Sequence, residues 1–198
     1  MIYGIGRNYA SHAKELGNSV PEKEPMVFFK PYAAIVNSNG SVKLPSFSTN
    51  VHYEVELCFK FGEELEIAQI CVGNDLTARD KQKEAQEKKS PWSVAKGFKQ
   101  SCGLGNWVTA AGVDLTQLEL KLTLNDAVVQ HGFTKDMIFN CEAIRRYLLE
   151  TFPVEPGDIV MTGTPEGVGA VKAGDKLVAD LTIANSKTLL SRGQWKFS

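Results

Sequence analysis

The sequence predicts a mainly β protein with a few short helices, an α+β fold. Short apolar or alternating segments recur along the chain, and Gly, Pro and Asn residues separate them. Only three segments show a helical pattern instead. The 198 residues contain no internal repeat and suffice for a substantial core. We therefore expect one domain, spanning residues 1–198, with its strands in a barrel or in folded sheets.

The clearest strand is Leu118–Leu124, where four leucines alternate with Glu119, Lys121 and Thr123. A period of two is typical of a half-buried antiparallel strand. Similar but less regular patterns predict further strands at Val27–Phe29, Val51–Phe61, Ile67–Val72, Ile159–Thr162 and Leu177–Ile183.

Three segments are predicted to be helical. Tyr9–Leu16 ends at Gly17, and the polar segment Ala78–Lys89 stops before a proline. The third, Cys141–Phe152, has an apolar stripe and can use Asn140 as its N-cap.

Composition favours a small-molecule partner. The 22 basic and 23 acidic residues leave a formal net charge of -1 without a basic block, which argues against nucleic acid and anionic membranes. The four cysteines form no Cys-x-x-Cys pair, and no apolar run reaches the roughly 18 residues of a membrane span. We expect a cytoplasmic protein.

An acidic strand is the first candidate for a site. Alternation places His52, Glu54 and Glu56 on one face, with the two carboxylates roughly 6 to 7 Å apart. Asp75 follows another predicted strand and can supply a third carboxylate. Such an all-oxygen set suits Mg²⁺ or Mn²⁺, with Ca²⁺ as an alternative. The spacing is equally typical of a solvated strand face with Asp75 as a helix cap, so both interpretations stay open.

His12 and Glu15 lie three residues apart on the first predicted helix, where a carboxylate can orient an imidazole as a general base. The alternative is that His12 is an ordinary surface histidine without a catalytic role. Lys96 is the one charged residue in a stretch of apolar and small residues, a place from which it can bind a substrate carboxylate or stabilise an oxyanion. It can equally extend to the surface.

Two further segments can contribute. Arg79 and Gln82, three residues apart on the second predicted helix, can face the cleft that contains Asp75. The glycine-rich segment Gly163–Gly169 follows a strand and can offer backbone N–H groups to an anion. It lacks the Gly-Lys-Ser/Thr of a nucleotide-binding loop.

In combination these segments resemble the fumarylacetoacetate hydrolase family, most closely its small acylpyruvase-like members. The likeness covers nearly the whole chain, and the joint order of its motifs makes it specific. The motifs are Gly6–Ala10, His12-x-x-Glu15, Phe29-Lys30-Pro31, His52-x-Glu54-x-Glu56-Leu57, Asn74–Asp80, Lys96-Gly97-Phe98 and Thr162–Gly169.

The resemblance implies a mixed β-sheet roll, a homodimer and a central cleft. It assigns roles as follows: Mg²⁺ ligands Glu54, Glu56 and Asp75, catalytic dyad His12 and Glu15, substrate-contacting or oxyanion-stabilising positions Arg79, Gln82, Lys96 and Thr164. One departure is that the segment between Glu56 and Asp75 is shorter than is usual in the family, which could alter the cleft wall or weaken the dimer.

The main functional hypothesis is Mg²⁺-dependent hydrolysis of a C–C bond in an acylpyruvate or similar 2,4-dioxo acid. His12, oriented by Glu15, would activate water, and Lys96 with Gln82 would stabilise the oxyanion. The alternatives are decarboxylation or tautomerisation of oxaloacetate and isomerisation of unsaturated 2-oxo diacids. A third hypothesis is a protein that binds a 2-oxo acid without turnover. The segment Asn18–Pro25 is a candidate mobile cover.

Overall fold

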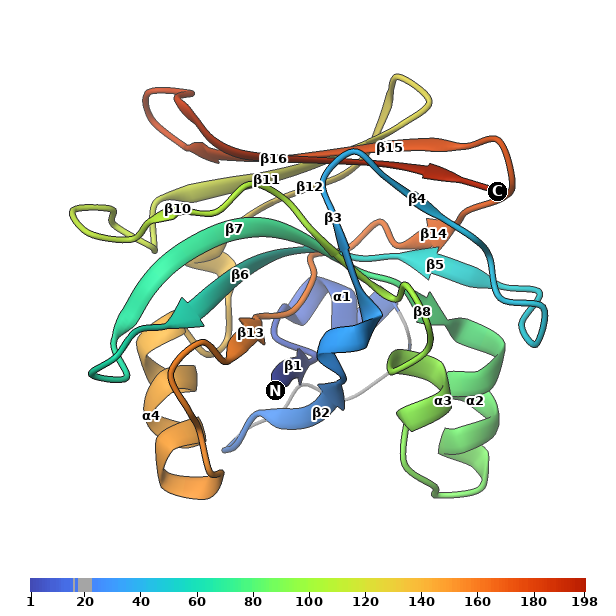
Figure 1. The fold of residues 1–198 in the computed structure, drawn as a ribbon, viewed down its shortest axis with the longest axis horizontal. Helices are drawn as coiled ribbons and strands as arrows, with labels where there is room; N and C mark the ends of the chain where they lie inside the picture. The colour runs from blue at the N-terminus through green and yellow to red at the C-terminus, as the bar shows by residue number, and fades with distance from the viewer. Residues whose placement is uncertain (16, 18–22) are drawn as a thin grey trace.

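The computed structural model describes residues 1–15, 17 and 23–198. Residues 18–22 of the predicted cover Asn18–Pro25 therefore lie outside the described part. Two large sheets dominate the described part, one above the other in Figure 1, with the helices on the far side of the lower sheet. The protein is thus mainly β, as predicted.

The lower sheet is strongly curled and mixed. Its order is β2-β1-β13-β6-β7-β9-β3, with β10 also paired to β7. Within it β1 runs parallel to β13 and β3 parallel to β9, whereas the other pairs are antiparallel. The strands are β1 (Ile2–Gly6), β2 (Met26–Lys30), β3 (Ile35–Asn37), β6 (Val55–Phe61), β7 (Ile67–Asp75), β9 (Cys102–Leu104), β10 (Val108–Thr109) and β13 (Ile159–Met161).

The upper sheet has the order β12-β11-β15-β16-β4, and a third, small sheet has the order β14-β5-β8. The upper strands are β4 (Gly40–Val42), β11 (Leu118–Leu124), β12 (Ala127–Phe133), β15 (Lys176–Ile183) and β16 (Leu189–Phe197). The small sheet contains β5 (Val51–Tyr53), β8 (Thr77–Ala78) and β14 (Gly169–Ala170).

The helices are short. They are α1 (Ala10–Glu15), α2 (Arg79–Glu87), α3 (Ser93–Lys96) and α4 (Cys141–Thr151), with 3-10 turns η1 (Tyr32–Ala34) and η2 (Thr134–Asp136). The three predicted helices are found, and Asn140 caps α4 because its side chain accepts a hydrogen bond from Ala143 N at 2.9 Å. In the described part no helix is long and apolar enough to cross a membrane.

The core lies between the two large sheets. Alternate residues of β11 and β15, such as Leu120 and Leu181, pack in one cluster with Leu57 and Val72 of the lower sheet. The Leu118–Leu124 alternation predicted this buried face, and β11 has the predicted ends. Buried apolar area of this kind is the main stabilising contribution of the fold.

The prediction of a single strand over Val51–Phe61 is wrong, and the difference shapes the site. Val51–Phe61 divides at Glu54 into β5 and β6, which belong to different sheets. The break is fixed by side chains, because Glu54 N donates to Asn74 Oδ1 at 3.0 Å and Val55 N donates to Gln130 Oε1 at 2.9 Å. These two backbone donors are therefore satisfied without a strand partner.

Several elements lack a clear sequence signal. β1 contains two glycines and is buried throughout, so it shows no alternation. Gly4 is required there, since a Cβ would lie 2.2 Å from the Phe28 ring. β16 was not predicted either, although its Trp195 is among the largest buried side chains.

Leu120→Ala tests the core between the sheets. Leu120 is completely buried, so its truncation is expected to lower the free energy of unfolding by about 2 to 5 kcal/mol. Val128→Ala on neighbouring β12 is the control, because that side chain is 59% exposed; its effect is expected within about 0.5 kcal/mol. Urea unfolding of both variants is the measurement, and equal losses would contradict this placement of the core.

Candidate active site

Three buried carboxylates meet where β6 begins and β7 ends. Glu54 precedes β6, Glu56 belongs to β6, and Asp75 ends β7. Ligand oxygens from all three lie within 4.8 Å of one another. The sequence interpretation as a solvated strand face is excluded, because the exposed fractions of these residues are only 0 to 3%.

The β6–β7 hairpin fixes this meeting point. Glu56 pairs with Gly73 and Val55 with Asn74, so the start of one strand faces the end of the other. The short segment between Glu56 and Asp75 is therefore a closed hairpin, and its shortness does not separate the carboxylates. Its turn is secured to α4 by a hydrogen bond of 3.0 Å from Arg145 Nη1 to Leu65 O.

Three cations compensate the acidic cluster. Lys96 Nζ donates to Glu54 Oε2 at 2.8 Å, to Asp75 Oδ2 at 2.5 Å and to Thr77 Oγ1 at 2.7 Å. Lys30 Nζ lies 2.6 Å from Asp75 Oδ1, and Arg79 forms an ion pair with Glu54. Because Lys96 uses all three of its N–H donors, it can reach a substrate only by exchanging one of these bonds.

The pKa values of the two glutamates move in opposite directions. Burial alone would raise the pKa of Glu54, but Lys96 and Arg79 together hold it well below its usual range. For Glu56, burial and the charges of Asp75 and Glu54 raise the pKa well above its usual range. Gly163 N donates to Glu56 Oε2 at 2.7 Å and opposes this shift only in part.

This arrangement fits a divalent cation. The donor set consists of oxygens, which hard cations such as Mg²⁺, Mn²⁺ and Ca²⁺ prefer. Burial and the neighbouring carboxylates raise the pKa of Glu56, and a cation between the three carboxylates would stabilise its charged form.

His12 and Glu15 form the predicted pair on α1. His12 Nδ1 lies 3.2 Å from Glu15 Oε2, and the other oxygen of Glu15 accepts a hydrogen bond of 3.0 Å from Gly167 N. Glu15 therefore orients the imidazole and fastens α1 to the glycine-rich segment. Nδ1 is occupied by this contact, which leaves Nε2 for a proton transfer.

Two N–H groups of the glycine-rich segment bind carboxylates of the protein itself. Gly163 N and Gly167 N donate to Glu56 and Glu15. Thr164 Oγ1 accepts a hydrogen bond of 2.9 Å from Gln130 Nε2. Gln130 also receives the Val55 N–H, so this one amide of β12 positions both Thr164 and the start of β6.

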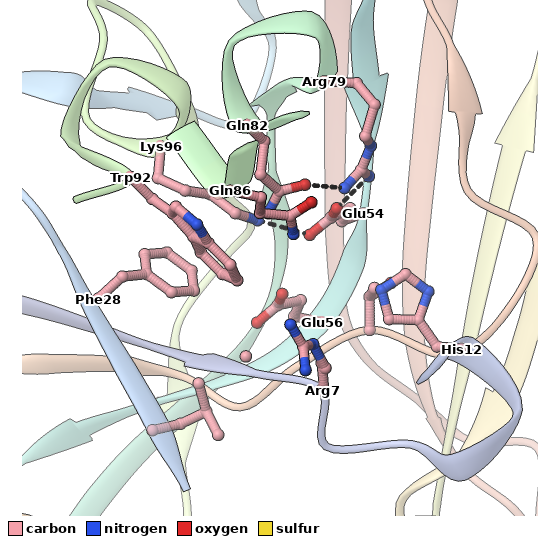
Figure 2. A pocket seen from close by; sticks show the side chains of 13 residues that line it. Arg7, His12, Phe28, Glu54, Glu56, Arg79, Gln82, Gln86, Trp92 and Lys96 are labelled. Carbon is pink, nitrogen blue, oxygen red and sulfur yellow. Dashed lines mark hydrogen bonds and ion pairs between the residues drawn. The ribbon is translucent and has the colours of Figure 1, made fainter. Parts of the chain in front are cut away.

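A pocket brings most of the predicted residues together (Figure 2). Seven of the nine line it: His12, Glu54, Glu56, Arg79, Gln82, Lys96 and Thr164. Asp75 and Glu15 lie behind this wall, in contact with Lys96 and His12 respectively. Gln82 Oε1 accepts a hydrogen bond of 2.6 Å from Arg79 Nη1, which holds both side chains in place.

A family model described as fumarylacetoacetate (FAA) hydrolase C-terminal matches residues 1–189. The chain belongs to the fumarylacetoacetate hydrolase family.

Its relatives include a mitochondrial oxaloacetate tautomerase of Arabidopsis thaliana, 39% identical over 91% of this chain and 86% of that protein. An oxaloacetate tautomerase of Escherichia coli is 38% identical over 87% of this chain and 84% of the relative. Among solved structures, fumarylpyruvate hydrolase from Pseudomonas aeruginosa in complex with Mn²⁺ and pyruvate has a TM-score of 0.88. It is 31% identical, and the match covers 99% of this chain and 88% of that one.

Other features of this family member were not given a role from sequence. Arg7, Phe28, Gln86 and Trp92 also line the pocket. Lys30 is completely buried, and it also donates to Ser101 O at 2.9 Å. The sequence signal that could have drawn attention to Lys30 is its position as the one charged residue among aromatic residues. For Arg7 the signal was a lone cation directly after an apolar segment.

His52 does not line the pocket, because it belongs to β5, which the break at Glu54 separates from β6. Its Nε2 lies 2.9 Å from Asn50 Oδ1, and burial with the nearby Arg79 lowers its pKa to about 4. His52 therefore stays neutral near pH 7 and flanks the acidic cluster without joining it.

Lys30→Met tests how far the fold depends on this charge compensation. The variant leaves Asp75 short of one counter-charge and the Ser101 carbonyl without its donor, so the free energy of unfolding should fall by about 3 to 5 kcal/mol. Lys43→Met, at an exposed lysine, is the matched control. Urea unfolding without added metal is the measurement, and equal stability of the two variants would argue against the role of Lys30.

Proposed function

We propose that this chain is a divalent-metal-dependent enzyme that interconverts the keto and enol forms of a 2-oxo dicarboxylate, with oxaloacetate as the first candidate. The observation that carries the proposal is that the buried Glu54–Glu56–Asp75 cluster and the His12–Glu15 pair meet at one pocket, which Glu54, Glu56 and His12 line. The oxaloacetate tautomerases among its relatives support the choice of substrate.

Glu54, Glu56 and Asp75 would hold the cation. Mg²⁺ is the first choice, with Mn²⁺ and Ca²⁺ as alternatives, and the complex of the P. aeruginosa hydrolase with Mn²⁺ and pyruvate supports a divalent ion. When bound, the ion would supply electrophilic stabilisation for the oxygens of a 2-oxo acid.

The charge balance favours a dianionic substrate. Three carboxylates face three paired cations, Lys30, Lys96 and Arg79, so the ionised cluster is neutral by itself. A divalent ion adds two positive charges in a largely buried site, and Arg7 on the wall of the same pocket adds a third. A dianion such as oxaloacetate would leave one of these charges uncompensated, whereas a monoanionic acid would leave two.

The protein's own residues would move the proton. His12 Nε2 would take a proton from C3 of the keto acid while Glu15 holds the imidazole through Nδ1, and the enolate oxygen would then take a proton from the His12 imidazolium or from water to give the enol. In the reverse direction the enol oxygen would lose its proton and His12 would return one to C3. Arg79, Gln82 and Thr164 line the pocket and would orient the substrate. Lys96 would stabilise the developing enolate oxygen by giving up its bond to Thr77.

Hydrolytic cleavage of an acylpyruvate is the second candidate. The same His12–Glu15 pair can activate a water molecule instead of a carbon acid, and the pocket presents Gln82 and Lys96 for the resulting oxyanion. Decarboxylation of oxaloacetate and isomerisation of unsaturated 2-oxo diacids use the same enolate chemistry. A protein that only binds 2-oxo acids has no use for this pair.

The proposal predicts that the chain accelerates the loss of the oxaloacetate enol absorbance with Mg²⁺ or Mn²⁺ and that EDTA abolishes the effect. His12→Ala is expected to lower the rate by about 10² to 10⁴-fold, the usual contribution of a general base. Pyruvate release from acetylpyruvate is followed in parallel. A rate that EDTA leaves unchanged would contradict the metal role, and acetylpyruvate cleavage without tautomerisation would favour the second candidate.

We also propose a homodimer. Met26 and Phe29 on β2, an edge strand of the lower sheet, and the following Tyr32 are exposed apolar side chains, which supports a partner there. Light scattering is expected to give twice the chain mass of 21.7 kDa. A monomer at micromolar concentration would overturn this proposal.

A further inference from the structure

The pocket contains one cation that none of the proposed roles uses. Arg7 follows β1 and lines the pocket together with His12, Glu54 and Glu56. Figure 2 shows its side chain directed toward the space near Glu56 and His12, whereas Arg79 and Gln82 enter from α2. Arg7 therefore faces the substrate space from a different element than the other cations.

Arg7 also differs from these cations in its partners. Lys30, Lys96 and Arg79 are each paired with Glu54 or Asp75. Within residues 1–15, 17 and 23–198, no acidic side chain pairs with Arg7. A guanidinium without a carboxylate partner is a strong donor for the planar carboxylate of a ligand, because its N–H groups match the two oxygens.

The backbone holds Arg7 in this place. Its φ is +58°, the left-handed region that favours glycine. The next residue, Asn8, is fixed by side-chain bonds of 2.8 Å to Phe139 O, 2.8 Å to Thr162 O and 2.7 Å from Phe139 N. Arginine gains nothing from this conformation, whose cost a glycine would avoid. The backbone conformation and the bonds of Asn8 together fix the direction in which the Arg7 side chain leaves the main chain.

The surroundings indicate which part of a ligand Arg7 meets. The 2-oxo acid end of the proposed substrate belongs at the three carboxylates and their ion, where Lys96 and Arg79 already lie. The other end of a four-carbon diacid needs its own counter-charge, because a buried carboxylate without one is unfavourable. The rest of the pocket wall is uncharged, with Phe28 and Trp92 as its aromatic side chains.

We propose that Arg7 binds the distal carboxylate of the substrate and so selects 2-oxo dicarboxylates over 2-oxo monocarboxylates. The proposal rests on the proposed function for the class of substrate and goes further by naming the residue that recognises the second charge. Arg7 is then a specificity-determining residue: it would hold the distal carboxylate next to C3, where His12 acts, while the acidic cluster and its ion hold the 2-oxo acid end.

Two stable ligands of equal carbon number test this without turnover. Malate and 2-hydroxybutanoate share a 2-hydroxy acid end, but only malate has a distal carboxylate. Calorimetric titration of the Mn²⁺-loaded protein is expected to show malate binding about 10- to 100-fold more tightly, the usual contribution of a charge-assisted bond. Arg7→Gly should abolish this preference while the affinity for 2-hydroxybutanoate changes little.

The variants separate recognition from folding. Glycine relieves the left-handed strain, so Arg7→Gly is expected to unfold at no lower urea concentration than the parent. Arg7→Lys keeps the charge but not the two-pronged geometry and should retain part of the preference. Lys89→Gly is the matched control, since Lys89 is an exposed cation with φ of +51° that does not line the pocket. This control should bind malate as the parent does.

A malate preference that survives in Arg7→Gly, or no preference in the parent protein, would overturn the assignment of Arg7. Failure of the proposed function has a different signature. In that case the parent would not accelerate oxaloacetate tautomerisation, although the preference for malate and its dependence on Arg7 could still be present.

Discussion

The structure depends on the compensation of buried charge around Asp75 and Glu54. Carboxylates so close together and so far from water repel each other and lose their hydration, which would unfold a small protein if nothing opposed it. The cations that oppose it come from β2, α2 and α3, three elements outside the β6–β7 hairpin. The acidic cluster therefore holds together the elements that surround the pocket, and pocket and fold form as one unit.

The negative charges of the acidic cluster are compensated unevenly, and this difference between the carboxylates gives the site its chemistry. Glu54 has Lys96 and Arg79 as close partners, whereas Glu56 has a backbone N–H and carries the raised pKa. Two glutamates two residues apart thus have opposite properties, because their partners differ and their burial does not. Glu56, which has no cation as a close partner, marks where an additional positive charge is most favourable.

The sequence predicts those features whose causes lie in neighbouring residues. The Leu118–Leu124 alternation reports the burial of one strand face, and Asn140 carries its own capping chemistry, so both were predictable. The break at Glu54 was not, because Asn74 and Gln130, which cause it, are distant in sequence. For the same reason the residues alone left the acidic strand open between site and solvated face. The joint order of motifs resolved that question, while Arg7 and Lys30 had no role until the structure placed them.

The two ends of the β6–β7 hairpin can change independently of each other. The carboxylates lie at its open end, whereas its closed end carries the turn around Leu65 and an irregularity in the pairing between Lys60 and Phe61. Pairs of residues can be added or removed at the closed end without shifting the register at the open end, and the irregularity absorbs a single one. A family built on this hairpin can therefore exchange its outer wall by insertion and deletion while its reactive centre is inherited unchanged.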